Sequence, residues 1–136
     1  MVRPRVLVVD DEPEILATIR RDLELEGIGV HTSSDASQAL ELLREHAHDV
    51  VVCDIMMPGF SGVELLRCIK AEHPLCQVMM MTGHSTLSRV VECFEAGTAD
   101  YFPKPLVDTE KLYASVRIAL EKADRWRLGM VMARRR

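Results

Sequence analysis

Short apolar runs alternate along this chain with longer segments in which apolar residues recur at helical spacing. The short runs predict five strands, at residues 5–9, 28–32, 50–53, 78–81 and 101–102. Most of these runs are apolar at nearly every position, which is typical of strands buried on both faces. The amphipathic segments predict five helices, at residues 13–26, 36–43, 63–72, 85–96 and from 108 onward.

Strands that alternate with helices in this way favour a parallel sheet with right-handed crossover connections. The connections are short, and 136 residues is close to the size of one ordinary domain. The predicted fold is therefore a single α/β domain, a doubly wound five-stranded parallel sheet of (βα)5 type with helices on both faces.

Polar side chains stand where four of the predicted strands end. Asp10 and Asp11 follow the first strand, Asp54 the third, Thr82 the fourth and Lys104 the fifth. In open α/β sheets, binding sites form outside the carboxyl ends of the strands. If the first, third, fourth and fifth strands are neighbours, we expect these five side chains to converge on one crevice.

The chemistry of this group indicates phosphoryl transfer. Three carboxylates in one pocket repel one another unless a cation joins them, and an all-oxygen site with free positions suits Mg²⁺. A lysine and a hydroxyl can bind a phosphoryl group as cation and hydrogen-bond donor. Asp54 is the candidate nucleophile, because it stands alone between the acidic pair and the Thr82 and Lys104 side.

Four segments, LVVDDEP, VVCDIMMPGFSG, MMMTGHS and GTADYFPKP, occur in this order, each at a predicted strand end. Together they resemble the receiver domains of bacterial two-component response regulators, which are CheY-like in fold. The resemblance covers about residues 5–121, and two of the segments are similar to receivers of NtrC-type transcription regulators. It implies a phosphoacceptor in a phosphorelay, supplied by a histidine kinase or a phosphotransfer protein. Such a domain is not an enzyme and assists only its own phosphorylation and dephosphorylation.

The resemblance also implies a metal site. Asp11 and Asp54 would bind Mg²⁺, or Mn²⁺, directly, together with the backbone carbonyl of Met56. Asp10 would hold the ion through water. Met56 also leaves a large apolar side chain close to the phosphoryl group, so the lifetime of the acyl phosphate stays open.

Further roles implied by the resemblance concern the phosphoryl group itself. Asp54 would carry it, and Thr82 and Lys104 would bind its oxygens. Thr82 would move toward those oxygens, and Tyr101 would turn as an aromatic switch. The Lys104–Pro105 peptide bond would be cis, as X-Pro bonds can be. The surface switched would be that of the fourth helix, fifth strand and fifth helix, which could also form a homodimer.

Charge divides the chain near residue 121. Residues 122–136 hold six basic side chains and one acid, so they carry +5, and residues 1–121 carry −9 of the total of −4. An acidic body argues against direct nucleic-acid binding, and no apolar run is long enough for a membrane span. We expect a cytoplasmic receiver domain at 1–121. Residues 122–136 would extend its last helix as a linker, a dimer contact or a tail. The domain would be either stand-alone or part of a larger regulator.

Two other function classes share parts of this pattern. A dehalogenase-like aspartyl phosphatase also uses an Asp nucleophile with Mg²⁺, but it needs a second acid where this chain has Met56. A flavodoxin-like flavin binder needs Ser, Thr or Gly after the first strand, where this chain has Asp10 and Asp11.

The cysteines and histidines outside these motifs show no metal-binding spacing. The four cysteines form no Cys-x-x-Cys pair, so we expect free thiols rather than a zinc site or disulfides. We expect the remaining histidines to be surface or hydrogen-bonded side chains; they include His31, His46, His48 and His73.

Overall fold

A computed structural model describes residues 2–83, 86–104 and 108–134. Its main sheet has five parallel strands in the order β2-β1-β3-β6-β7. These strands are β1 (Pro4–Val9), β2 (Gly29–Ser33), β3 (Val50–Asp54), β6 (Gln77–Thr82) and β7 (Asp100–Pro103). The helices are α1 (Pro13–Leu25), α2 (Ala36–Glu45), α3 (Gly62–Glu72), α4 (Leu87–Glu95) and α5 (Thr109–Arg134). The predicted doubly wound α/β fold is confirmed.

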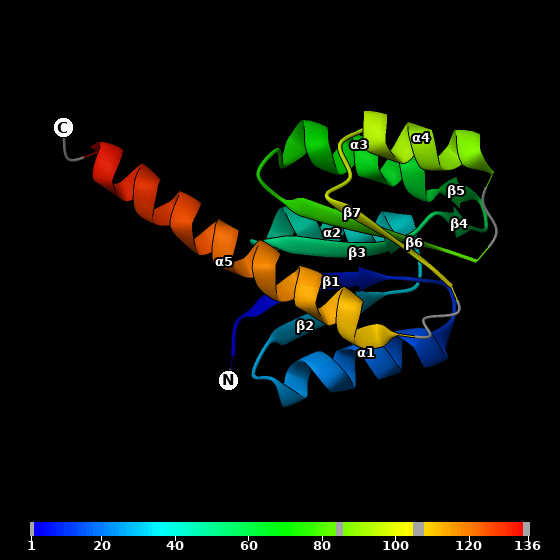
Figure 1. The fold of residues 1–136 in the computed structure, drawn as a ribbon, viewed down its shortest axis with the longest axis horizontal. Coiled ribbons are helices and arrows are strands. Elements are labelled where there is room, and N and C mark those ends of the chain that lie inside the picture. The colour runs from blue at the N-terminus through cyan, green and yellow to red at the C-terminus, as the bar shows by residue number, and fades with distance from the viewer. Residues whose placement is uncertain (1, 84–85, 105–107, 135–136) are drawn as a thin grey trace.

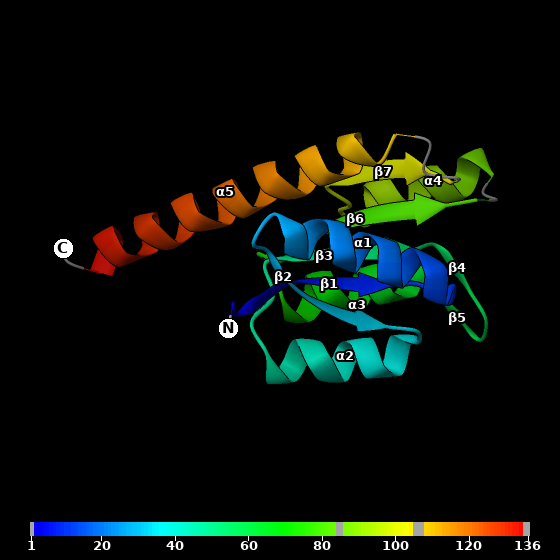
Figure 2. The same cartoon turned by 90° about the horizontal axis from the view of Figure 1, so that it is seen from below.

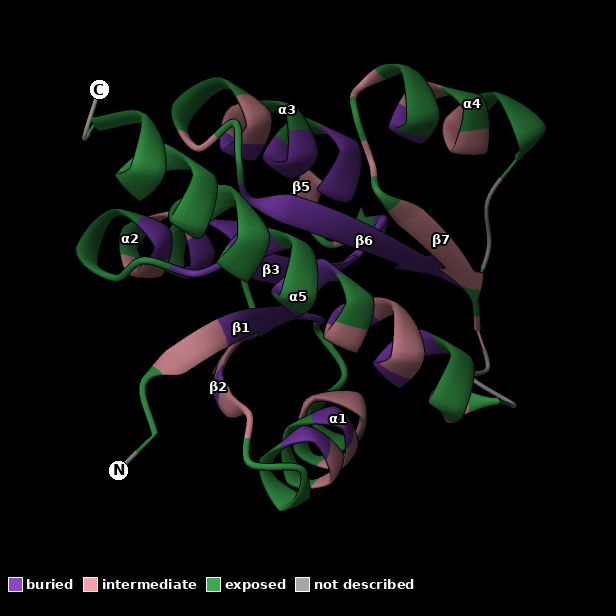
Figure 3. Ribbon diagram, turned by 60° about the vertical axis from the view of Figure 1, so that its left-hand side comes forward, coloured by how far each residue is buried: buried purple, intermediate pink, exposed green. Residues whose placement is uncertain are grey.

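Helices cover both faces of the sheet, as Figures 1 and 2 show from two sides. On one face α1 and α5 pack against the strands through a core that includes Ile19, Leu23 and Val116. On the other face α2, α3 and α4 enclose a second core. The sheet lies between the two, and β3 and β6 are buried along their whole length (Figure 3). This explains why their sequences are almost uniformly apolar.

Local signals in the sequence begin and end the helices. Asp35 accepts a hydrogen bond from the backbone N–H of Gln38 and Ser61 accepts one from Val63, so each caps a helix N-terminus. Gly27, just beyond α1, has a φ of 81°, a conformation that favours glycine. One element was not predicted. The segment between β3 and α3, where the sequence indicates neither strand nor helix, contains a small antiparallel hairpin of β4 (Met56–Met57) and β5 (Phe60–Ser61), too short to show any periodicity.

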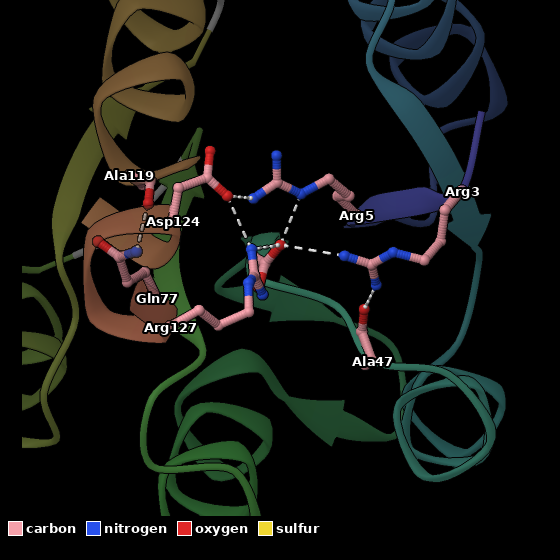
Figure 4. A network of polar contacts seen from close by, with 8 residues as sticks. Arg3, Arg5, Ala47, Gln77, Ala119, Asp124 and Arg127 are labelled. Carbon is pink, nitrogen blue, oxygen red and sulfur yellow. Dashed lines mark hydrogen bonds and ion pairs between the residues drawn. The ribbon is translucent and has the colours of Figure 1, made fainter. Parts of the chain in front are cut away.

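α5 continues without a break beyond residue 121, and Ala123 is the last buried residue in its described part. Figure 4 shows the ion pairs that hold this part of the helix to the amino-terminal edge of the sheet. Arg5 lies 2.7 Å from Asp49 and 2.7 Å from Asp124, and Arg127 lies 2.7 Å from Asp49 and 2.9 Å from Asp124. The direction in which α5 leaves the domain is therefore fixed by side chains and not by the helix alone. Neither α5 nor any other helix of the described residues is long and apolar enough to cross a membrane.

Candidate functional site

The sheet order places the predicted polar residues at one edge. β1 and β3 are neighbours, β3 pairs with β6, and β6 pairs with β7. In this register Asp54 lies beside Met81, and Thr82 lies beside Pro103, the residue before Lys104. Parallel strands end at the same side of the sheet, so the carboxyl ends of β1, β3, β6 and β7 form one crevice. The structure therefore brings together the strand ends that carry the predicted site residues.

The acidic residues of the crevice form a cluster suited to a hard cation. Asp10, Asp11 and Asp54 each offer a carboxylate oxygen, and these oxygens lie within 4.8 Å of one another. Asp10 and Asp54 are buried, whereas Asp11 is exposed. Asp11 and Asp54 help to line a pocket with a volume of about 580 Å³. Two buried carboxylates and one exposed carboxylate, with open space beside them, fit Mg²⁺, which keeps several water ligands.

Lys104 supplies positive charge to the same cluster. Its ammonium nitrogen lies 2.7 Å from Asp10 Oδ2, 3.0 Å from Glu12 Oε2 and 3.1 Å from Asp54 Oδ2. Burial alone would lower the pKa of Lys104, but hydrogen bonds to the three carboxylates raise it above its ordinary value. The pKa of Asp10 is also raised, because burial outweighs the attraction of Lys104. The lysine therefore stays charged at neutral pH.

Glu12 is a residue of this site that the sequence did not predict. It follows the acidic pair in the DDEP segment, where its charge could be read as an ordinary helix-start acid. Its backbone N–H donates to Asp10 Oδ1 at 2.9 Å, and its carboxylate reaches across the pocket mouth to Lys104. Glu12 thus adds a further negative charge to the crevice, in contact with Lys104.

Asp54 is held in place by the turn that follows it. The backbone N–H of Met56 donates to Asp54 Oδ1 at 3.1 Å, which leaves Oδ2 toward Lys104. A Cβ at Gly62 would collide with the backbone oxygen of Asp54 and lie 2.7 Å from the Cα of Ile55. The glycine that ends the VVCDIMMPGFSG segment is therefore required by the close approach of α3 to the end of β3. Met56 is half-exposed and lines the pocket.

Thr82 and Tyr101, the predicted switch pair, come from neighbouring strands. Thr82 is buried, and its hydroxyl has no hydrogen-bond partner among the described residues. Tyr101 is half-buried on β7, opposite Met80 in the register, and packs against the core under α2, α3 and α4. An unpaired buried hydroxyl is unfavourable, so Thr82 is ready to donate to an added acceptor. The predicted cis peptide involves Pro105, which lies outside the described residues.

The remaining predictions about reactive side chains can also be compared with the structure. All four cysteines are free thiols, as expected. Burial raises the pKa of the Cys76 thiol to about 12, so this cysteine is a core residue rather than a nucleophile. Burial, and then the charge of the neighbouring Asp54, raise the pKa of the Cys53 thiol as well.

Comparison with known proteins identifies relatives of this chain. A family model described as "Response regulator receiver domain" matches residues 6–117. Over 120 residues the chain is 38% identical to the DNA-binding transcriptional regulator NtrC of Escherichia coli (strain K12), covering 88% of this chain and 25% of that protein. It is 34% identical over 118 residues to the response regulator MprA of Mycobacterium sp. (strain KMS), covering 87% of this chain and 51% of that protein. The chain thus spans about a quarter to a half of these relatives.

Solved structures agree. A CheY-like receiver domain protein from Methanospirillum hungatei JF-1 superposes with a TM-score of 0.85 at 28% identity, covering 90% of this chain and 98% of that chain. The beryllofluoride-activated NtrC4 receiver domain dimer has a TM-score of 0.80 at 31% identity, covering 90% and 98%. With the family match, the fold and the strand-end crevice in agreement, the chain belongs to the response regulator receiver domain family.

Proposed function

We propose that this domain is a phosphoacceptor in which Asp54 receives a phosphoryl group from the phosphohistidine of a histidine kinase or of a phosphotransfer protein. One observation carries the proposal. Lys104, whose side chain is only 10% exposed, pairs with Asp54 at 3.1 Å, and on the neighbouring strand the buried Thr82 hydroxyl has no partner in the part of the chain that the structure describes. A cation paired with the carboxylate and an unpaired donor on the neighbouring strand match what a phosphoryl group needs.

In the proposed reaction, an Asp54 carboxylate oxygen attacks phosphorus as the bond from phosphorus to the imidazole nitrogen breaks. The leaving imidazole keeps the electron pair, and an acyl phosphate forms on Asp54. Lys104 balances the charge of the equatorial oxygens, and Thr82 donates to one of them. Asp10, Asp11 and Asp54 are the side chains that would hold Mg²⁺, with the backbone carbonyl of Met56. When bound, that ion would neutralise the charge that collects on the transferring group.

We further propose that phosphorylation changes a protein-interaction face. As Thr82 turns toward the phosphoryl oxygens, Tyr101 turns inward, and an equilibrium between two states of α4, β7 and α5 shifts. The large apolar side chains exposed on α4 and α5 include Leu87, Val91, Phe94 and Ile118. They suit a partner protein or a second copy of the chain, and the solved NtrC4 relative is titled a dimer. The acidic body supports an output through protein contacts rather than through nucleic acid bound by this domain.

Beryllofluoride, which mimics a phosphoryl group on a carboxylate, tests this function. With Mg²⁺ present it should shift the amide resonances of residues 82–83 and 86–104 in the wild type. The same addition to Asp54→Asn should leave them unchanged, and the Asp124→Asn variant, altered at the opposite end of the sheet, should respond like the wild type. An unchanged wild-type spectrum would refute the proposal. Steady turnover of p-nitrophenyl phosphate would favour the dehalogenase-like phosphatase instead.

A further inference from the structure

A cluster of three histidines lies outside the phosphorylation site. His31 is on β2, His46 directly follows α2, and His48 lies two residues before the start of β3. Their ring centroids are 4.8 Å apart for His31 and His46, 5.1 Å for His31 and His48, and 6.1 Å for His46 and His48. As expected, His46 is exposed and His31 and His48 are hydrogen-bonded, but no pattern in the sequence indicates that the fold gathers all three at one place.

The topology explains how residues from three segments meet. His31 pairs in register with Leu7, which faces the core under α2 and α3. Neighbouring residues of paired strands point to the same face, so His31 faces the same side of the sheet. α2 ends at Glu45 on this side, and the chain returns to β3 through the short segment that holds His46 and His48. The cluster is thus built by the sheet register and the end of α2.

We propose that His31, His46 and His48 form a binding site for one divalent transition-metal ion of the Zn²⁺ class. Imidazole nitrogen is a preferred ligand of these ions. In a tetrahedral site with zinc–nitrogen bonds of roughly 2.0–2.1 Å, imidazole centroids lie about 5 Å apart, the spacing that this cluster approaches. Water would fill the fourth position.

Two of the three ligands are already aligned. His31 Nδ1 and His48 Nε2 lie 2.8 Å apart, so they share one proton, and a metal ion that replaces this proton would use both lone pairs. His48 is buried, and its other ring nitrogen has no hydrogen-bond partner within the described ranges, so the cluster is poorly satisfied by hydrogen bonds alone. Burial and the neighbouring histidines lower the pKa of His48 to about 4, which keeps its ring neutral and able to bind a metal at pH 7.

The third ligand has to turn. Among the described residues, only the acidic cluster already has its ligand atoms within 4.8 Å of one another, so the His46 ring must rotate toward the other two. His46 is exposed, and its rotation meets little packing. Two arginines lie near the cluster, but the positive charge of each is paired with an acidic side chain. Arg3 lies 3.7 Å from Asp49, and Arg20 lies 2.9 Å from Glu24.

A zinc titration against a chromophoric chelator tests the site. The parent protein should carry Asp11→Asn and Asp54→Asn, so that zinc cannot bind the acidic cluster. It should bind one Zn²⁺ per chain. His46→Gln and His31→Gln should each weaken binding by at least about tenfold, because even outer-shell partners of a metal site are worth roughly 10- to 100-fold. His73→Gln, which changes a histidine at the end of α3, is the matched control and should bind like the parent.

Chemical shifts give a second measurement that does not depend on the variants. Zinc should shift the amide resonances of residues 30–32 and 46–49, and leave those of 10–12 and 82–83 in place. Equal zinc affinity in the parent and in His46→Gln would overturn the proposal. So would the absence of stoichiometric binding, or shifts confined to the acidic crevice. None of these outcomes bears on Asp54 as phosphoacceptor, so the two proposals fail separately.

Discussion

The ammonium nitrogen of Lys104 lies 3.1 Å from a carboxylate oxygen of Asp54, and only 2.7 Å from one of Asp10. Lys104 thus neutralises part of the negative charge of two buried acids. Without this lysine, a bound divalent cation would have to balance that charge alone. An added phosphoryl group would bring new oxygens to the same lysine. In the proposed mechanism, the pairing of Lys104 with Asp54 would therefore link metal binding, phosphorylation and the stability of the crevice.

Replacing Lys104 with Met should lower the free energy of unfolding in Mg²⁺-free buffer by about 2 kcal/mol, because two buried carboxylates lose their cation. The same change should tighten Mg²⁺ binding about tenfold, since a repelling charge roughly 4 Å away is worth on the order of 1 kcal/mol or more. Urea denaturation and calorimetric Mg²⁺ titration measure the two effects. Lys111→Met, at an exposed lysine of α5, should change neither. Weaker Mg²⁺ binding in Lys104→Met would contradict the role given to this lysine.

Removing the Thr82 hydroxyl should raise the stability of the protein but abolish the response of α4. Thr82→Val removes a buried hydroxyl that is unpaired among the described residues, so the unphosphorylated protein should become more stable by about 1 kcal/mol. The variant should still bind beryllofluoride at Asp54 but should not shift the resonances of α4. Thr82→Ser keeps the hydroxyl and should retain the shift. A full α4 response in Thr82→Val would show that this hydroxyl is not the link to the switch.

The ion pairs at the other end of the sheet should control the end of α5. Arg127→Met removes contacts to Asp49 and Asp124, so the amides of residues 124–134 should exchange with solvent faster. The free energy of unfolding should fall by only about 1 kcal/mol, because Arg127 is exposed and solvent screens its charge. Arg125→Met, two residues earlier on the same helix, is the control. Equal exchange in both variants would mean that helix propensity alone orders this segment.

Tyr113 joins α5 to α1 by a hydrogen bond from its hydroxyl to Asp22 at 2.6 Å. Burial, and then this bond, raise the pKa of Tyr113 above its ordinary value. A raised pKa means that the folded state holds the phenolic proton more tightly, so this stabilisation is complete below about pH 10 and is lost as the pH rises further.

Tyr113→Phe should therefore lower the free energy of unfolding by about 1 kcal/mol at pH 7 and should flatten its decline above pH 10. Asp22→Asn should lower it as well, because it removes the charged acceptor. Urea denaturation at several pH values gives both quantities. A variant Tyr113→Phe that keeps the full alkaline decline would assign that decline to another group.

Much of the fold was predictable because burial on both faces leaves β1, β3 and β6 almost free of polar residues. Parallel strands with helical crossovers then place their carboxyl ends together, which is why Asp10, Asp54 and Thr82 could be grouped from the sequence alone. The closeness of Lys104 to Asp54 follows from the same convergence of strand ends. The distance between their charged atoms cannot be predicted from it.

Other features depend on contacts that no local pattern encodes. Arg5 meets Asp124 across 119 positions, and both look like ordinary surface charges in the sequence. The histidines are hidden for a similar reason, since His31 reaches His48 only through the strand register. Glu12 was missed because an acid at a helix start has a simpler explanation than a contact with Lys104.

The most direct test of the central claim is the intact mass of the protein after incubation with acetyl phosphate and Mg²⁺, followed by peptide mapping. The account predicts one added phosphoryl group in the wild type, located at Asp54, and none in Asp54→Asn. A phosphoryl group on another residue, or equal labelling of the wild type and Asp54→Asn, would contradict it.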